Sequence, residues 1–416
     1  MSASRLIGIR CGLNIGRGDW MAEGLGVRNL SLQRLLHWPH LELCGLLVLI
    51  TVFLIRNYHV VGALVFGVAE FPADLGGDSG RYTSGADRWV ADEPLVGKQA
   101  SYLGYILVLA GLRTLSLAYD WVMPVQLLFT AAAACAAFGL GRDVAGRLAG
   151  FLAALWLVEN PDIAIWNRYL LTDSLYISSL VITLWAWHRA VIRWELLPLV
   201  AAVMLLLWTM TIRPNGWVLL PLMVMFLAFR LGAWKAVLTI ALPGLVLLVV
   251  SVLLLKPLQS GIQNENPMDF LSKGIVIWDY DAWNRQMPPT ETDSTSDWRN
   301  IGSYAMRYPM ETLTLVAARV GIVLARVRPY YPWQMNLRIG VRYIVMYGLL
   351  LLGIIWYWRH LAVKLLVAAI VLHLGVVGLT VASWDGRFLT HFFPLIAVLA
   401  GVGAAGWGRR WYQGRD

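Results

Sequence analysis

Charged residues are scarce in this chain of 416 residues: they make up 14% of it, whereas 58% of its residues are hydrophobic. Apolar stretches of spanning length recur along the sequence, which indicates an integral membrane protein. Lysine and arginine outnumber aspartate and glutamate by 34 to 25, which gives a formal charge of +9. Because these basic residues are spread over short loops between apolar runs, membrane orientation explains the excess, and binding of nucleic acid is not predicted.

Cysteine is rare, and neither cysteine nor histidine forms a ligand pattern. Cys11, Cys44 and Cys135 are an odd number without metal-ligand spacing, and two of them lie in apolar segments. No disulfide framework or zinc site follows from them. The seven histidines show no paired spacing, and we find neither an internal repeat nor a low-complexity tract. The sequence therefore predicts one membrane domain without a firm metal site.

The apolar runs predict an all-α membrane protein, a polytopic helical bundle of about 11–13 apolar segments that do not all cross the bilayer. The first run, 41–55, has no small-residue cleavage pattern behind it, so we interpret it as an uncleaved anchor. Residues 1–40 then form a cytoplasmic segment, and residues 41–416 form a single transmembrane domain. The later runs are 101–118, 122–140, 148–158, 171–187, 197–212, 216–231, 236–255, 341–357, 363–381 and 388–407.

The distribution of charge predicts the orientation. Residues 1–40 carry five arginines against two acidic residues, which places the N-terminus in the cytoplasm. Two polar stretches, 57–100 and 256–340, are too hydrophilic to lie in lipid, so they are expected to be external loops with short interfacial helices. Segment 311–328 is apolar but contains three arginines, which favours a helix lying in the interface.

Two basic segments test this topology. Arg409 and Arg410 follow the last apolar run, so the C-terminus is expected in the cytoplasm. The segment 141–147, with Arg142 and Arg147, also indicates a cytoplasmic position. Counting every run from 101 to 158 as a full crossing would place it outside, so one of those runs is expected to be re-entrant.

Four polar motifs interrupt the apolar pattern. In their order and spacing they resemble the GT-C superfamily of polytopic membrane glycosyltransferases, particularly the bacterial relatives of protein O-mannosyltransferases and the lipid A aminoarabinose transferase. Each motif is weak alone, and it is the series over most of the chain that carries the resemblance. The motifs are Gly77-Asp78-Ser79-Gly80-Arg81-Tyr82, Asn167-Arg168-Tyr169-Leu170-Leu171-Thr172-Asp173-Ser174-Leu175, Ile212-Arg213-Pro214-Asn215-Gly216, and Asp385-Gly386-Arg387-Phe388 with Pro394.

The resemblance implies a GT-C-type bundle in a bacterial inner membrane, with its active site on the outer face. The implied reaction transfers a hexosyl or pentosyl group, with inversion, from a polyprenyl-phosphate donor to a glycan, glycolipid or protein acceptor. It assigns Asp78 the role of general base. A carboxylate suits that role because an acceptor hydroxyl loses a proton as its bond to the anomeric carbon forms. The alternative is that Asp78 only shapes a glycine-rich turn.

Donor binding requires cations, because charge develops on the phosphate as the sugar departs. Arginine is suited to this, since its planar guanidinium binds phosphate oxygens in pairs. Each arginine could instead snorkel at the end of a span. Arg213 and Arg387 stand out because each adjoins a helix-breaking proline or glycine at the outer boundary. The candidates for donor-phosphate binding are Arg213, Arg387, Arg168, Arg326 and Arg328, and the resemblance adds Lys98.

Four further residues are candidates for substrate binding. Tyr82 follows Asp78 by one helical turn, and its alternative is an interfacial anchor. Asp173 begins an apolar helix, so it either caps that helix or faces Asp78, where it would orient the sugar or support Arg168. Tyr330 and Tyr331 belong to aromatic residues around the second external loop; most of these are expected in an interfacial belt, and one or two against the acceptor.

Some members of the superfamily bind a divalent cation through acids of the first external loop, which here would be Asp78 with Glu70, Asp74 or Asp87. That loop contains no Asp-x-Asp sequence, so no essential metal is predicted.

Two other functions stay open. A transporter or flippase of lipid-linked glycans would be similarly hydrophobic and basic, but ionisable groups within spans and repeated halves are typical of that class. A polymerase or ligase with a diphosphate-linked donor would share the external arginines without needing Asp78 as a base.

Overall fold

The computed structural model describes residues 39–231, 267–289, 298–383 and 386–413. Contacts divide the chain into a short unit, Met1–Val48, and a large unit, Leu49–Asp416, and the description below concerns the large unit. The described residues form helices and no strand, with three isolated β-bridges. Most of the expected cytoplasmic segment 1–40, the apolar run 236–255 and Asp385 lie outside the described residues.

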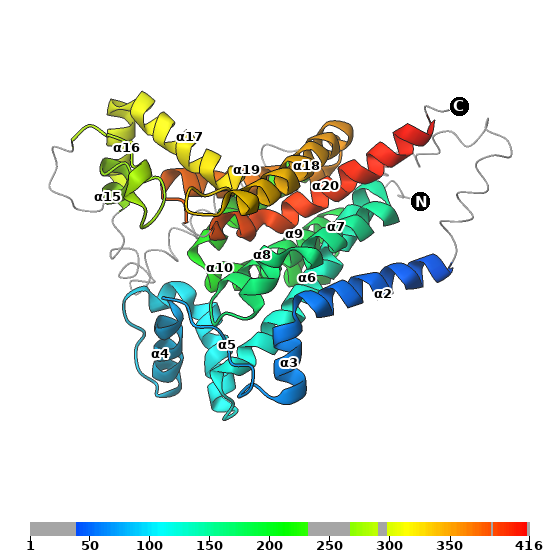
Figure 1. Ribbon diagram of the computed structural model, residues 1–416, viewed down its shortest axis with the longest axis horizontal. Helices are drawn as coiled ribbons and strands as arrows, with labels where there is room; N and C mark the ends of the chain where they lie inside the picture. The colour runs from blue at the N-terminus through cyan, green and yellow to red at the C-terminus, as the bar shows by residue number, and fades with distance from the viewer. Residues whose placement is uncertain (1–38, 232–266, 290–297, 384–385, 414–416) are drawn as a thin grey trace, which may run out of the picture. The chain divides into compact units, whose positions relative to one another are not determined.

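Figure 1 shows the helices in chain order. Most of the longer helices lie on the expected apolar runs and end where polar or helix-breaking residues interrupt them. The helices 79–90, 267–272 and 298–307 lie in the two polar stretches. The α-helices are α2 (Pro39–Arg56), α3 (Tyr58–Phe66), α4 (Ser79–Val90), α5 (Leu103–Thr114), α6 (Val122–Ala145), α7 (Arg147–Glu159), α8 (Pro161–Ala164), α9 (Asp173–Arg193), α10 (Leu196–Ile212), α11 (Leu219–Leu231), α15 (Pro267–Ser272), α16 (Trp298–Arg307), α17 (Pro309–Ala325), α18 (Trp333–Tyr357), α19 (Leu361–Leu379) and α20 (Arg387–Gln413). Short 3-10 helices are η1 (Gly97–Tyr102), η2 (Tyr119–Trp121), η3 (Ile165–Asn167), η4 (Pro214–Val218) and η6 (Asp281–Trp283).

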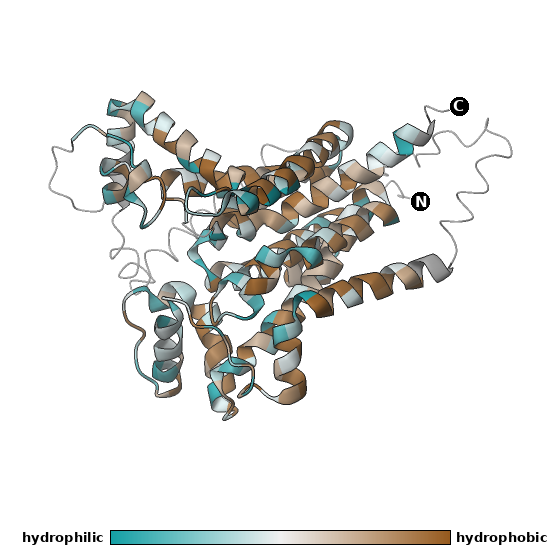
Figure 2. Ribbon diagram, viewed as in Figure 1, coloured by the Kyte–Doolittle hydropathy of each residue, from teal (hydrophilic) through white to brown (hydrophobic). Residues whose placement is uncertain are grey.

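Five helices in the described part are long and apolar enough to cross a membrane, which is consistent with a multi-pass membrane protein. They are α6 extended by η2, α9, α18, α19 and α20. Two bent pairs, α2 with α3 at 80° and α7 with α8–η3 at 56°, raise the number to seven if each pair is one span. Figure 2 shows α18 and much of α2 in the apolar colour, whereas polar residues gather in α4 and the loops. The larger number of apolar segments stays a prediction.

Helix α20 is the central helix of the unit. It packs against α6, α7, α9, α18 and α19. Of its apolar stretch, 89% is buried inside the protein, compared with 17% for the apolar stretch of α18. Glycines allow this close packing, as small residues do in membrane bundles. A Cβ atom added at Gly403 would lie 1.8 Å from the carbonyl oxygen of Leu349, and one at Gly401 would lie 2.8 Å from that of Ala149. The α20 backbone therefore touches the backbones of α18 and α7 directly.

Polar contacts place the segment 141–147 within this bundle. The carboxylate of Asp143 lies 3.0 Å from Nε of Arg189 at the end of α9, and Arg409 near the end of α20 donates to the Ala145 carbonyl. The segment therefore shares one end of the bundle with the C-terminal ends of α9 and α20. Helix α6 is a candidate span, whereas α5 is only 12 residues long and is not one. The run 101–118 therefore forms a helix too short to cross, and the cytoplasmic position of segment 141–147 stays a prediction.

The opposite end holds segment 160–172, which a buried network of neutral polar side chains fixes in place. Nε2 of Gln126 donates to the carbonyl oxygens of Asn167 and Tyr169 at 3.1 and 3.0 Å, and more weakly to that of Trp166. The Asn167 side chain donates to Asn57 at 2.7 Å and accepts from Thr130 at 2.9 Å. These bonds tie the segment to α6 and to the start of α3, because buried polar groups must find partners.

Replacing Gln126 by leucine tests that network. The Gln126 side chain is fully buried, so Gln126→Leu leaves backbone carbonyl oxygens of segment 160–172 without a donor. We expect the free energy of unfolding to fall by about 1–3 kcal/mol, the usual cost of stranding a buried polar group. Thermal unfolding in detergent measures this. The control Gln334→Leu changes an exposed glutamine of α18 and should shift stability by less than about 0.5 kcal/mol. Equal effects of the two substitutions would contradict the role of Gln126.

Two buried arginines fix α17 and the residues after it to neighbouring backbone. Arg319 is fully buried and donates to the carbonyl oxygens of Phe270, Ile275 and Gly378 at 2.7, 2.8 and 3.0 Å. Burial lowers the pKa of Arg319 to about 10. Arg328 donates to the carbonyl oxygens of Ile322 and Ser383, at 2.8 and 3.1 Å. Arg319 in α17 and Arg328 after its end both belong to segment 311–328, which was expected to lie in the interface, and both side chains bind backbone carbonyls of the protein.

Candidate functional site

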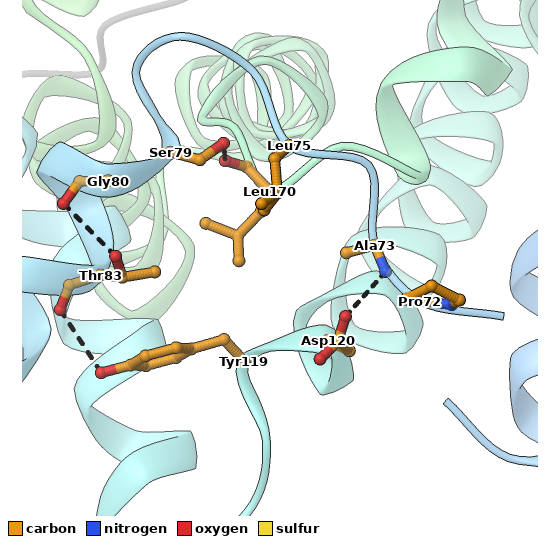
Figure 3. A pocket seen from close by; sticks show the side chains of 9 residues that line it. All are labelled: Pro72, Ala73, Leu75, Ser79, Gly80, Thr83, Tyr119, Asp120 and Leu170. Atoms are coloured by element: carbon orange, nitrogen blue, oxygen red, sulfur yellow. Dashed lines mark hydrogen bonds between the residues drawn. The ribbon is translucent and has the colours of Figure 1, made fainter. Parts of the chain in front are cut away.

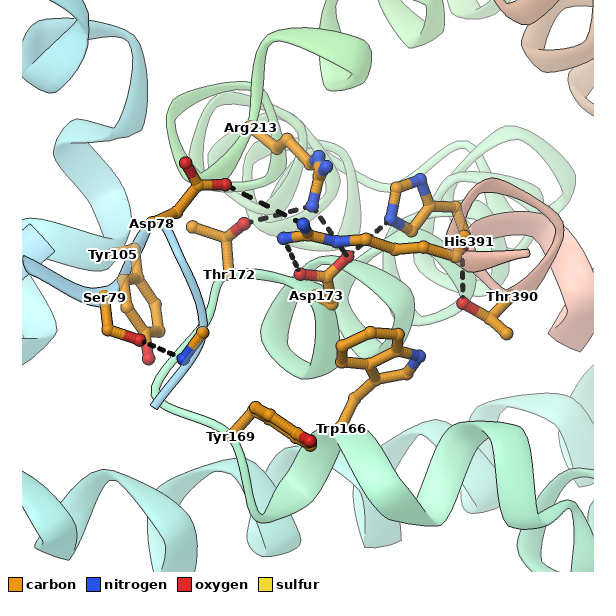
Figure 4. Close-up of polar contacts among 12 residues, drawn as sticks. Asp78, Ser79, Tyr105, Trp166, Tyr169, Thr172, Asp173, Arg213, Thr390 and His391 are labelled. Carbon is orange, nitrogen blue, oxygen red and sulfur yellow. Dashed lines mark hydrogen bonds and ion pairs between the residues drawn. The ribbon is translucent and has the colours of Figure 1, made fainter. Parts of the chain in front are cut away.

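Asp173 forms the centre of a buried cluster of charged side chains (Figure 4). Its carboxylate is fully buried at the first residue of α9. Arg213 lies 2.7 Å from Oδ1, and Arg387 contacts both oxygens, with its Nε 2.6 Å from Oδ1. His391 Nε2 also lies 2.8 Å from Oδ1. The N-cap residue of α9 is Thr172, which makes no side-chain capping bond, and the partners of the Asp173 carboxylate are the cations and the histidine.

Arg387 joins this cluster to Asp78 of the loop before α4, which was expected to be external. Its Nη1 lies 3.7 Å from Oδ2 of Asp78, and Arg81 lies 3.2 Å from the other oxygen. Below the guanidinium lies the ring of Trp166, whose centroid is 5.5 Å from the Arg387 Cζ atom (Figure 4). Arg387 therefore bridges two carboxylates, from the first loop and from α9, over an aromatic face.

Local sequence explains why the two arginines reach Asp173. Arg213 precedes Pro214, which disfavours helical backbone at the preceding residue. Its φ and ψ of −154° and 141° are extended, so α10 ends at Ile212. At the start of α20, Gly386 has φ of +74° and lies so close to Arg326 that an added Cβ atom would be 2.5 Å from Nε. Glycine meets both requirements, and Arg387 follows as the first residue of α20.

Exposure separates the two carboxylates of the cluster. The Asp78 side chain is 33% exposed, whereas that of Asp173 is fully buried. Asp78 precedes α4 without making a capping bond. The neighbouring Ser79 holds the turn instead, because its hydroxyl accepts from the Gly76 amide at 2.8 Å and donates to the Leu170 carbonyl at 2.9 Å. Asp78 is thus the carboxylate of this cluster that a molecule from outside can reach.

The cluster has an excess of positive charge. Three guanidinium groups, of Arg81, Arg213 and Arg387, face the two carboxylates of Asp78 and Asp173, which leaves one positive charge. Arginines fixed by ion pairs in a partly buried site are suited to an anion, since their orientation is set before it arrives.

The other candidate cations lie in separate contacts. Arg168 pairs with Asp74 at 3.0 Å and does not contact Asp173. Arg326 pairs with Asp162 at 3.1 Å; burial is the largest single influence and lowers the pKa of Arg326, but Asp162, Tyr331 and Tyr343 together raise it above the ordinary value. Burial lowers the pKa of Arg328, whose carbonyl partners are described above. Lys98 lies half-buried in η1.

Three tyrosines were candidates for substrate contact. Tyr82 is 1% exposed, and its ring packs edge-to-face against Tyr102 and Tyr105, with both centroid distances 5.2 Å. Burial raises the pKa of Tyr82. Its side chain is therefore part of the core between α4 and α5. Tyr330 is 39% exposed and packs edge-to-face on Tyr331 at 5.3 Å, close to Arg326.

Sequence reasoning did not select His391, Arg81 or Trp166. His391 lies four residues after Arg387, which places both on one face of a helix. That spacing was the available signal for His391. Arg81 follows Asp78 by three residues and shows the same kind of spacing. Trp166 gave no signal, since nothing in the sequence distinguishes it from the other 20 tryptophans.

Metal binding has little geometric support in the part of the chain that the structure describes. No group of three or more histidine, cysteine, aspartate or glutamate residues there is arranged to hold an ion. An Asp-x-Asp sequence does occur in the second external loop, at Asp279 and Asp281, which sequence reasoning passed over; both residues are exposed.

No protein-family model matches the sequence, and a search of curated proteins finds no significant relative. The contacts of the described residues therefore carry the functional argument.

Proposed function

We propose that this chain is a GT-C-type glycosyltransferase that moves a sugar from a polyprenyl-phosphate donor to an acceptor at the external face of a bacterial inner membrane. The proposal rests chiefly on one observation, the bridge from Asp78 through Arg387 to Asp173 and Arg213. It unites all four motifs that resemble the superfamily, in a protein with several candidate spans.

The proposed reaction is a single displacement. The acceptor hydroxyl gives its proton to Asp78 as its oxygen bonds to the anomeric carbon, and the bond from that carbon to the phosphate oxygen breaks. Polyprenyl phosphate leaves with the bonding electron pair, and the configuration of the sugar inverts. Asp173 is fully buried between two arginines and a histidine, so it is not available as a second, nucleophilic carboxylate. This favours inversion over a covalent intermediate.

Arg387 links donor binding to activation of the base. It pairs closely with Asp173 and loosely, at 3.7 Å, with Asp78. A donor phosphate bound to Arg387 and Arg213 would compete for that guanidinium and weaken its hold on Asp78, whose freed oxygen could then accept the acceptor proton. Asp173, buried beneath both arginines, would keep them in position as charge develops on the phosphate.

Lipid analysis of cells tests the proposal. We expect one polyprenyl-phosphate sugar to accumulate in cells that lack the protein and to return to its normal level when the native chain is restored. Mass spectrometry of lipid extracts measures this and identifies the donor. Accumulation of a diphosphate-linked glycan instead would support a polymerase or ligase. No change in any polyprenyl-linked sugar would contradict the proposal.

A further inference from the structure

A pocket of about 380 Å³ lies beside the first external loop (Figure 3). Its volume is within the range of small-molecule sites, about 300–1,000 Å³. Segment 72–83, which ends in the first turns of α4, lines it together with η2 and Leu170. Tyr119 contributes an aromatic ring to the lining, while Thr83 and Asp120 contribute polar groups.

The polar groups of the pocket are suited to hydroxyl groups. Oδ1 of Asp120 accepts from the Ala73 amide at 2.7 Å, and within the described residues its second oxygen has no hydrogen-bond donor. The Thr83 hydroxyl donates to the Gly80 carbonyl and keeps its lone pairs for a ligand. The Tyr119 hydroxyl is bound to Asp87 at 2.6 Å, which fixes the ring as a flat surface in the pocket. A carboxylate oxygen, a hydroxyl and a fixed aromatic ring together fit a polyhydroxylated ring.

Charge distinguishes this pocket from the arginine cluster. No lysine or arginine belongs to its lining, whereas it contains the carboxylate of Asp120. An anionic group would therefore find no cation in the pocket, and the arginines that would attract it lie around Asp173.

The first loop connects the two places. Ser79 lines the pocket, and Asp78, its neighbour in the chain, carries the ion pairs to Arg81 and Arg387. Leu170 lines the pocket from the other side, and its carbonyl accepts from the Ser79 hydroxyl. A ligand in the pocket would thus lie next to the residue that presents Asp78.

We propose that this pocket binds the acceptor, and that the acceptor end is a neutral saccharide ring held by Asp120, Thr83 and Tyr119. The inference rests on the proposed glycosyl transfer and names the acceptor class that the sequence leaves open. The phosphate of the donor then lies at the arginine cluster, the acceptor ring in the pocket, and Asp78 between them.

Gly80 provides a variant that adds bulk at the wall of the pocket. It lines the pocket in the first turn of α4, and a Cβ atom added there would meet no atom within 4 Å. Gly80→Leu therefore places a side chain in open space, and leucine favours a helix more than glycine does. Gly80→Ala is the matched control, since it makes the same backbone change without filling the pocket.

Saturation-transfer NMR tests the inference with methyl hexopyranosides as probes and the full chain in phosphatidylcholine nanodiscs. We expect saturation of the protein to reach the protons of the probe sugar with the native chain and with Gly80→Ala. We expect this signal to be lost with Gly80→Leu. Asp120→Asn and Thr83→Val remove single polar interactions without filling the pocket. Each should weaken binding about fivefold, the effect of one hydrogen bond of about 1 kcal/mol.

Three results would overturn the inference. They are no saturation-transfer signal for any methyl hexopyranoside, equal signals with the native chain and Gly80→Leu, or binding of glycerol 3-phosphate in place of the sugars. If the donor lipid nevertheless accumulates in cells without the protein, glycosyl transfer stands and only the acceptor site is wrong. If the sugars bind in the pocket but no donor lipid accumulates in cells without the protein, the pocket is a sugar site and the proposed glycosyl transfer is contradicted.

Discussion

Substituting Asp78 by asparagine is expected to lower the rate of sugar transfer by about 10²- to 10⁴-fold, the usual contribution of a positioned general base. The amide has nearly the same shape as the carboxylate but cannot take the acceptor proton. Purified protein, assayed with the lipid that accumulates in cells without it, measures this rate. Donor affinity should change little, because the phosphate is assigned to Arg213 and Arg387.

Stability should be nearly unchanged in this variant. Asp78 is one-third exposed, so its ion pair with Arg81 contributes at most about 1 kcal/mol to folding. Asp92→Asn is the matched control, because it makes the same chemical change in the same loop at an exposed residue with φ of +57°, a conformation that asparagine also accepts. Its rate should equal that of the native chain. Transfer by Asp78→Asn at the native rate would remove Asp78 from the mechanism.

Substituting Asp173 by leucine is expected to lower the free energy of unfolding by about 3–5 kcal/mol. The side chain is fully buried and has three partners, Arg213, Arg387 and His391. Leucine would leave the two guanidinium groups partly buried without a compensating carboxylate, and an uncompensated buried charge is costly. Unfolding in mixed detergent micelles, followed by circular dichroism, measures the loss. Activity should fall too, because the arginines would lose their orientation.

Glu93→Leu is the control for Asp173→Leu. Glu93 is an exposed acid that pairs with Arg88 at 3.4 Å, so its loss should change stability by less than about 1 kcal/mol. If Asp173→Leu were as stable as this control, the ion pairs around Asp173 would not hold the cluster together. A native rate of transfer in Asp173→Leu would separate the cluster from the active site.

The helical architecture could be predicted from the sequence because the apolar runs are long and their interruptions are polar. Helix ends were also readable where chemistry forces them, as at Arg213 before Pro214. The number of membrane spans was harder to predict from the sequence. Bends such as the one between α2 and α3 depend on tertiary contacts that a hydropathy pattern does not contain.

Four charged members of the cluster, Asp78, Asp173, Arg213 and Arg387, could be selected from the sequence, but Arg81 and the pairing of these side chains could not. Asp173 and Arg387 are 214 residues apart, and only the packing of α20 against α9 brings them together. One role considered for Asp173, the support of Arg168, was wrong for the same reason. The backbone of Arg168 pairs with that of Asp74 in the first loop, and the side chains of these two residues form an ion pair.

Neutral polar residues within apolar runs were the largest omission. Gln126 carries no charge and matches no motif, and Asn167, although it opens one of the four motifs, is uncharged and was given no role there. Yet in an apolar interior each must be bonded, and together they determine where segment 160–172 lies. A polar amide inside a candidate span is therefore a usable signal for a buried anchor near a site.

The central claim is that the chain breaks the bond between sugar and lipid phosphate, and purified protein in proteoliposomes tests it most directly. The donor lipid, labelled in its sugar, is added with an extract that contains the acceptor. We predict that label leaves the lipid and that polyprenyl phosphate appears in equal amount, with both slowed in Asp78→Asn. Label that stays on intact donor lipid and only crosses the bilayer would contradict the account and identify a transporter.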